Sequence, residues 1–175
     1  MPIVITDLRE KILAAARSAL LSGGYEELNM RRIAASCGIA VGTVYNYFPS
    51  KEMLAAGVML MDWQETLGHM RRDIQAAPAP LDALRAIFDW IVGFSDRYRL
   101  SWEQYADAGK GYPLRGGYHR QLVGQLEEMI VSVLERFGCV FVPALPGFLA
   151  EGILSAAAEG HRSFDELAPI FSRLL

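Results

Sequence analysis

Polar side chains that could read a nucleic acid gather in one short stretch of the chain. From Leu28 to Lys51 every charged residue is basic, although the whole chain has 20 acidic and 17 basic residues. Within this stretch Asn46 can form two hydrogen bonds with the edge of an adenine, and Arg31 can bind a guanine or a phosphate. The segment therefore offers a local surface for an anion, in a chain whose formal net charge is -3.

A short helix over residues 40–48 would direct these polar groups outward. At about 100° per residue Ala40, Val44 and Phe48 fall on one face, which is expected to be buried, and Asn46 is centred on the opposite face. Glycine on the outward face lets the backbone approach a phosphate closely, and neutral hydroxyl groups can bond its oxygens. The outward residues beside Asn46 are Gly42, Thr43 and Tyr45.

Two further helices are needed to hold this helix in place. Apolar residues at helical spacing predict a first helix from about residue 6 to the Gly23–Gly24 pair. Asn29 is a good N-cap for a second, short helix, and Gly38 would end it in a left-handed conformation. Three helices with a glycine in the turn between the second and third are the pattern of a helix-turn-helix.

Three runs in this region are distinctive: Ile33-Ala34, Gly38-Ile39 and Gly-Thr-Val-Tyr-Asn-Tyr-Phe-Pro-Ser-Lys-Glu from Gly42 to Glu52. On these residues the segment 9–53 closely resembles the DNA-binding region of the tetracycline-repressor (TetR)/AcrR family of bacterial transcriptional regulators. The resemblance implies a homodimeric repressor that reads a palindromic operator and binds a small-molecule effector with its remainder. The positions that match DNA contacts of the family are Arg31, Val41, Gly42, Thr43, Tyr45, Asn46, Tyr47 and Lys51.

The sequence departs from the family pattern at Ala40 and Val41, and at Tyr47 helical geometry conflicts with the contact that the family implies. Ala40 stands where the family usually has a Ser or Thr cap, which costs the third helix roughly 1 kcal/mol of capping. Val41 replaces a residue that is often polar, so its base contact would be apolar, for example with a thymine methyl. Tyr47 lies at the edge of the buried face and would reach a phosphate only with its hydroxyl.

The rest of the chain also has helical periodicity and few strand signals, which predicts an all-helical fold of about nine helices. An amino-terminal helix-turn-helix domain, residues 1–49, is expected to be joined by a long helix to a ligand-binding and dimerisation domain, residues 50–175. Glycines and a proline predict a loop over 109–117. The six later helices are expected over about 50–75, 82–98, 101–108, 118–137, 146–161 and 163 or 165 to the end, with Pro169 favouring the later start.

Aromatic residues are concentrated in this second part. A buried Trp N–H or Tyr O–H group needs a hydrogen-bond partner. Several such residues facing one bundle interior therefore suggest a cavity for an apolar or aromatic ligand. The same residues could instead form a filled core. The expected ligand-binding residues are Trp63, Trp90, Phe94, Trp102, Tyr105 and Tyr118.

Small residues recur four apart near the carboxyl end, at Gly152, Ala156 and Gly160, with Leu149 and Ile153 beside them. Such a stripe lets another helix approach closely. In a plan that resembles the TetR family it is expected to pair with its twin in a symmetric dimer, which would match a palindromic operator.

Other function classes find little support. No catalytic triad order, H-E-x-x-H, Walker or dinucleotide-binding motif is present, so no enzyme activity and no cofactor are expected. Cys37 and Cys139 lack metal-ligand spacing. We find no signal peptide and no apolar run long enough to span a bilayer, so a cytoplasmic protein without membrane contact is expected. The alternative that stays open is a DNA-binding regulator whose second domain only dimerises or binds a protein partner.

Overall fold

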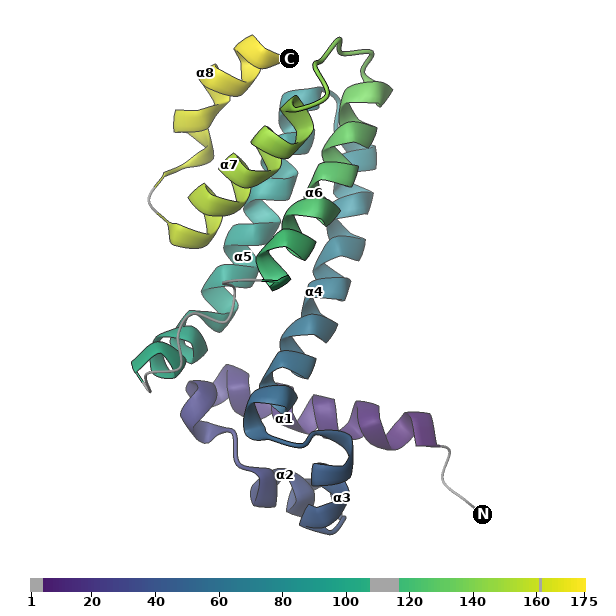
Figure 1. The fold of residues 1–175 in the computed structure, drawn as a ribbon, viewed down its shortest axis with the longest axis vertical. Helices are drawn as coiled ribbons and strands as arrows, with labels where there is room; N and C mark the ends of the chain where they lie inside the picture. The colour runs from purple at the N-terminus through teal and green to yellow at the C-terminus, as the bar shows by residue number, and fades with distance from the viewer. Residues whose placement is uncertain (1–4, 108–116, 161) are drawn as a thin grey trace. The chain divides into compact units, whose positions relative to one another are not determined.

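The computed structural model describes residues 5–107, 117–160 and 162–175, and within them the chain is all-helical, as the sequence predicts. Figure 1 shows the eight helices of the described residues in chain order. They are α1 (Ile5–Glu27), α2 (Met30–Cys37), α3 (Val41–Tyr47), α4 (Lys51–Ala76), α5 (Pro80–Asp107), α6 (Gly117–Arg136), α7 (Leu145–Glu159) and α8 (Phe164–Leu174).

Two boundaries differ from the expected ones. The fifth and sixth expected helices are one continuous helix, α5, because neither Gly nor Pro interrupts the chain between Phe94 and Asp107. Helix α8 begins directly after Ser163, earlier than Pro169 suggests, because Ser163 and Glu166 form a capping box there. Of the expected loop over 109–117, only Gly117 lies among the described residues, as the first residue of α6.

The chain divides into two compact units. Unit 1 comprises residues 1–64 and 97–112, and unit 2 comprises residues 65–96 and 113–175. The first half of α4 and the last turns of α5 therefore belong with α1, α2 and α3, which extends unit 1 beyond the expected residues 1–49. We describe each unit separately.

A fully buried carboxylate, that of Asp62 on α4, organises the polar interior of unit 1. The Arg17 Nε of α1 donates to both of its oxygens, at 2.7 and 2.9 Å, and the Tyr98 hydroxyl of α5 donates at 2.6 Å. Arg97 lies 3.5 Å from the same carboxylate. Because a buried charge is costly unless it is paired and hydrogen-bonded, these contacts hold α1, α4 and α5 together.

Apolar packing completes unit 1 around the first three helices. The side chains with 4% or less of their surface exposed include residues from α1, α2, α3 and the residue after α3. The spacing of these residues gives each helix one apolar face. They are Ile12, Leu13, Ala16, Leu20, Ile33, Ala34, Val44 and Phe48.

In unit 2 the helices α6 and α7 run side by side (Figure 1). Both contribute apolar side chains to the core of the unit, among them Ile130 and Ile153. Helix α8 adds Phe164 and Phe171, which contact each other edge to face with ring centroids 6.0 Å apart. Arg136, near the end of α6, donates to the carbonyls of Ile74 and Ala77 at 2.6 and 2.9 Å. These bonds provide a side-chain donor for two carbonyls where α4 ends, one of which, that of Ile74, also accepts from the N–H of Ala77.

The Asp62 cluster makes the stability of the protein depend on pH through Tyr98. Burial, together with the hydrogen bond to Asp62, raises the pKa of Tyr98 well above its usual value near 10. In the unfolded chain this tyrosine ionises near pH 10, whereas in the folded chain it keeps its proton. The unfolded state then binds fewer protons, so the free energy of unfolding falls as pH rises above 10, by about 1.4 kcal/mol per pH unit.

We therefore expect Tyr98→Phe to be less stable than the parent by about 1 kcal/mol at pH 8, because one buried hydrogen bond is lost. That difference should vanish and reverse by about pH 11, since the variant lacks the group that titrates. Urea unfolding of both proteins at pH 8 and pH 11 checks this, because the other tyrosines cancel in the comparison. An identical difference at both pH values would contradict it.

Candidate nucleic-acid interface

Both ends of α2 are capped as the sequence predicts. The Asn29 Oδ1 accepts hydrogen bonds from the backbone N–H groups of Arg31 and Arg32 at 3.0 and 3.2 Å. Gly38 has φ 70° and ψ 34°, and its N–H bonds the carbonyls of Ala34 and Ala35. A left-handed residue in this place is the common helix stop, and the chain then turns directly toward α3.

Helix α3 has little local support of its own. It begins after Ala40, which has an extended backbone and makes no side-chain cap bond, so the expected weak cap is present. Ala40 is exposed, which corrects its expected place on the buried face, because an N-cap lies just outside the helical register. Val44 and Phe48 are buried as expected, with 0% and 4% of their surface exposed. Packing through these two side chains therefore holds α3 in place.

The opposite face of α3 is open. Tyr45 has 46% of its surface exposed, and Asn46 and Gly42 are exposed as well. A methyl group built on Gly42 would meet no atom within 4 Å. The eight residues expected to contact DNA all belong to unit 1, and none of them is buried: Arg31, Gly42, Tyr45 and Asn46 are exposed, and Val41, Thr43, Tyr47 and Lys51 are half-buried.

The two arginines at the start of α2 differ in their surroundings. Arg32 donates to the Glu27 carboxylate at 2.6 Å, so its charge is partly neutralised. Arg31 is exposed and forms no ion pair with any residue that the structure describes. Arg31 is therefore the one of the two whose charge is available to an anion such as a phosphate.

Sequence reasoning predicts the Ser50 cap of α4 but misses the contacts of Tyr25 with Lys51 and Glu52. The Tyr25 hydroxyl donates to Glu52 at 2.9 Å, and the Lys51 ammonium lies 4.1 Å from the centre of the Tyr25 ring. Ser50 accepts from the N–H of Met53 at 3.2 Å and caps α4. A cation over an aromatic ring is attracted to its face, so Tyr25 helps to place Lys51. Spacing along the chain gives no sign of this contact, because Tyr25 and Lys51 are far apart in sequence.

The expected ligand-binding aromatic residues have different surroundings. Trp63 and Trp102 are buried in unit 1, with 4% and 2% of their surface exposed, and Tyr105 of the same unit is half-buried. Trp90 of unit 2 is half-buried, donates to Asp73 at 2.7 Å and stacks on His69 at 4.8 Å. The remaining two are Phe94, which is buried in unit 2, and Tyr118, whose side chain lies outside the described residues.

The expected dimer stripe on α7 is corrected in part. Leu149 and Ile153 have no exposed surface and Ala156 has 8%, so these side chains pack inside unit 2 and offer nothing to a partner. Gly152 is half-buried, and Gly160 is the left-handed cap of α7. The spacing of small and apolar residues is the same for a core face as for an interface, which explains the error. Among the large apolar side chains described on α7, Phe148 is the exposed one, with 63% of its surface exposed.

These observations define a class of protein: an all-helical chain whose amino-terminal helices form a helix-turn-helix. Its second helix, α3, has an exposed face and no acidic residue. The family model described as bacterial regulatory proteins, tetR family, matches residues 12–58. Residues 12–58 therefore form the TetR-family helix-turn-helix segment, and the recognition of the family from the sequence is confirmed.

Curated relatives agree over the same region. The chain is 37% identical over 67 residues to the HTH-type transcriptional regulator UidR of Escherichia coli, which covers 38% of this chain and 34% of UidR. It is 29% identical over 128 residues to the HTH-type transcriptional repressor KstR of Mycobacterium tuberculosis, which covers 73% of this chain and 57% of KstR. The match thus spans about a third to a little over half of these relatives, and both are named as regulators, not enzymes.

The fold extends the likeness to the whole chain. A TetR-family transcriptional regulator from Pectobacterium atrosepticum superposes with a TM-score of 0.70 at 20% identity, over 99% of this chain and 96% of that one. No helix among the described residues is long and apolar enough to cross a membrane. The same residues contain no cluster of three or more His, Cys, Asp or Glu side chains that could hold a metal ion.

Proposed function

We propose that the protein is a cytoplasmic DNA-binding transcriptional regulator, a repressor whose α3 enters the major groove of a palindromic operator. The observation that carries this proposal is the outward face of α3, where Tyr45 and Asn46 are exposed beside the open backbone of Gly42. Asn46 is suited to an adenine edge, and the hydroxyl groups of Thr43 and Tyr45 are suited to phosphate oxygens.

Charge supports the same surface. No acidic residue occurs between Leu28 and Lys51, so a phosphate near α3 meets no like charge from this segment. Arg31 adds to this segment an exposed cation that forms no ion pair with the described part of the chain. The number of such cations is small, so each copy of the chain neutralises few phosphates, and affinity should fall only modestly with added salt.

We propose further that a small apolar or aromatic effector binds the second part of the chain and releases the operator. The buried tryptophans Trp63 and Trp102 support an apolar binding site, since indole rings give large contact areas with few rotatable bonds. To release DNA, the effector must bind the DNA-free arrangement more tightly than the DNA-bound one. The alternative is a second part that only dimerises or binds a protein partner.

The dimer in this proposal forms through the exposed face of α6 and α7. Phe148 is largely exposed, and Gly124 and Gly152 have open space where a Cβ would stand. Phe148 and Gly152 are four residues apart on α7 and share one face, so a large apolar side chain lies next to a small position, which suits close helix packing with a second copy. Two copies related by a two-fold axis would present two α3 helices to the two half-sites of a palindrome.

Substitutions on the proposed reading face should separate base contacts from phosphate contacts. For a duplex enriched by the parent protein from a random-sequence pool, Asn46→Ala should weaken binding by about 1 to 3 kcal/mol and relax the preference at one base pair. Arg31→Ala should weaken binding to all duplexes and lower the salt slope by about one. Fluorescence anisotropy across a salt series measures both effects.

The exposed Arg71→Ala on α4 is the matched control for the loss of an arginine, because Arg71 belongs to unit 2 and makes no ion pair with a described residue. It should leave affinity and salt slope at parental values. Parental binding by both Asn46→Ala and Arg31→Ala would refute the proposed reading face.

Effector binding should be coupled reciprocally to DNA binding. Titration of tryptophan fluorescence with a panel of small aromatic carboxylates and fatty acyl thioesters should find a compound whose affinity falls when the enriched duplex is present. The compound should lower the affinity for the duplex by the same factor, since coupling free energy is shared. A compound that binds equally with and without duplex would argue against release by that class of ligand.

The dimer proposal predicts that Phe148→Glu shifts the protein toward a monomer, because a charge would be buried without a partner in the interface. Multi-angle light scattering at several concentrations measures this shift. Leu60→Glu on α4 is the control, since Leu60 is also exposed, at 47%, and belongs to unit 1. A Phe148→Glu variant that remains as dimeric as the control would exclude this interface.

A further inference from the structure

One side chain near the end of α5, that of Gln104, holds the turn in which α1 leaves regular helix. Its Oε1 accepts a hydrogen bond from the backbone N–H of Glu26 at 2.9 Å. Its Nε2 donates to the carbonyl of Gly23 at 3.3 Å. A single amide therefore satisfies a donor and an acceptor that the break in α1 leaves without helical partners.

The turn itself has a shape that only glycine adopts readily. Gly24 has φ 73° and ψ -161°, and Gly23 next to it also departs from helical angles. A Cβ on Gly24 would overlap the Oε1 of Gln104 and lie 3.0 Å from the Cγ of Leu100. The backbone of α1 thus approaches α5 more closely here than any other residue type would allow.

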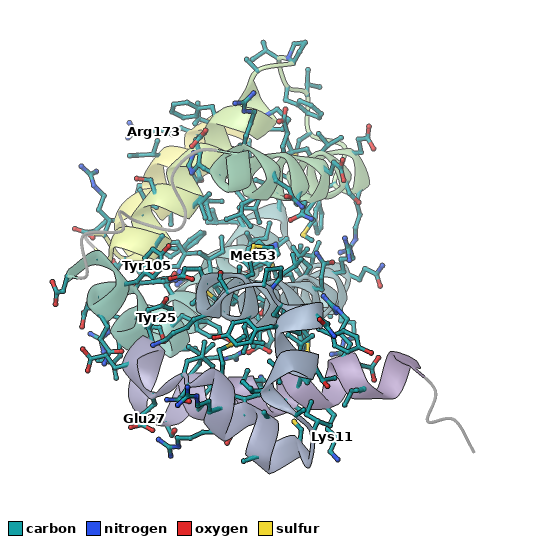
Figure 2. All side chains as sticks on the ribbon, turned by 60° about the horizontal axis from the view of Figure 1, so that its bottom comes forward. Lys11, Tyr25, Glu27, Met53, Tyr105 and Arg173 are labelled. Carbon is teal, nitrogen blue, oxygen red and sulfur yellow. The ribbon has the colours of Figure 1, made fainter. Side chains whose placement is uncertain are left out.

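The residue that follows this turn is Tyr25, which is buried with 6% of its surface exposed. Its ring meets that of Tyr105 edge to face at 5.1 Å, and Figure 2 shows the two tyrosines next to each other. Tyr25 also donates a hydrogen bond to Glu52, and the ammonium of Lys51 lies over its ring. The position of Lys51 at the start of α4 therefore depends on the turn that Gln104 holds.

We propose that Gln104 is a positioning residue for DNA binding: by fixing the Gly23–Gly24 turn, it makes Tyr25 present Lys51 to a phosphate of the duplex. This inference rests on the proposed function and adds to it a residue from α5, outside the helix-turn-helix. Gln104 itself touches no DNA and acts through Tyr25 and Lys51.

The test compares Gln104→Met, Lys51→Met and the double variant, because methionine keeps the length of both side chains and removes their hydrogen bonds or charge. The probe is the duplex enriched by the parent protein, titrated across a salt series. Gln104→Met should lose about fivefold in affinity, the equivalent of one net hydrogen bond. Its salt slope should fall by about one, the signature of a lost phosphate contact.

The double variant should bind no more weakly than the weaker single variant, since both changes remove the same contact. Gln64→Met, at an exposed position of α4 in unit 1, is the matched control and should bind as the parent does. Thermal unfolding midpoints of all variants show whether the loss of affinity occurs at parental stability. Hydrogen exchange of the Glu26 amide should be faster in Gln104→Met than in the control.

Two outcomes distinguish this inference from the function on which it rests. If the parent enriches no duplex from the pool, the proposed function fails, and the role of Gln104 in DNA binding fails with it. If the parent binds, a Gln104→Met variant with parental affinity, an unchanged salt slope or a loss that adds fully to that of Lys51→Met overturns this inference alone.

Discussion

A carboxylate without exposed surface must find its counter-charges inside the fold, because an ion deprived of water and left unpaired costs several kcal/mol. For Asp62 these partners come from two other helices: Arg17 from α1, and Tyr98 and Arg97 from α5. Each of the three helices is thereby tied to the other two at one point. Because α1 packs directly against α2, the position of the helix-turn-helix within unit 1 depends on Asp62 and its partners.

A second set of contacts holds the far end of α1. Gln104 bonds the backbone of the Gly23–Gly24 turn, and Tyr25 bonds the start of α4. A helix held at one point can still pivot, whereas a helix held near Arg17 and again after Gly24 has a defined direction. The last turns of α5 supply a partner at both points, through Tyr98 and Gln104. Helix α5 therefore helps to hold α1 in place, although it lies outside the helix-turn-helix.

The parts of the fold that could be predicted from the sequence are those fixed by neighbours along the chain. The caps at Asn29, Gly38 and Ser163 involve groups within five residues, so their spacing is visible. Asp62 gives no such signal, because its partners Arg17 and Tyr98 are 45 and 36 residues away. Ile153 shows the same limit: its spacing fits a core and an interface equally, and only long-range packing separates the two.

The outward face of α3 was predictable as a pattern, but its stability was not. With seven residues and no side-chain cap, α3 is too short to persist alone, since isolated helices of that length are marginal in water. Its order comes from burying Val44 and Phe48 against the rest of unit 1. A binding surface that is already ordered in the free protein loses less conformational entropy when it binds. This matters most for a surface with few cations, because its contacts supply little binding free energy to offset such a loss. The buried pairs of Asp62 and the amide of Gln104 therefore help to form the exposed face of α3 and the start of α4, although neither side chain belongs to that face.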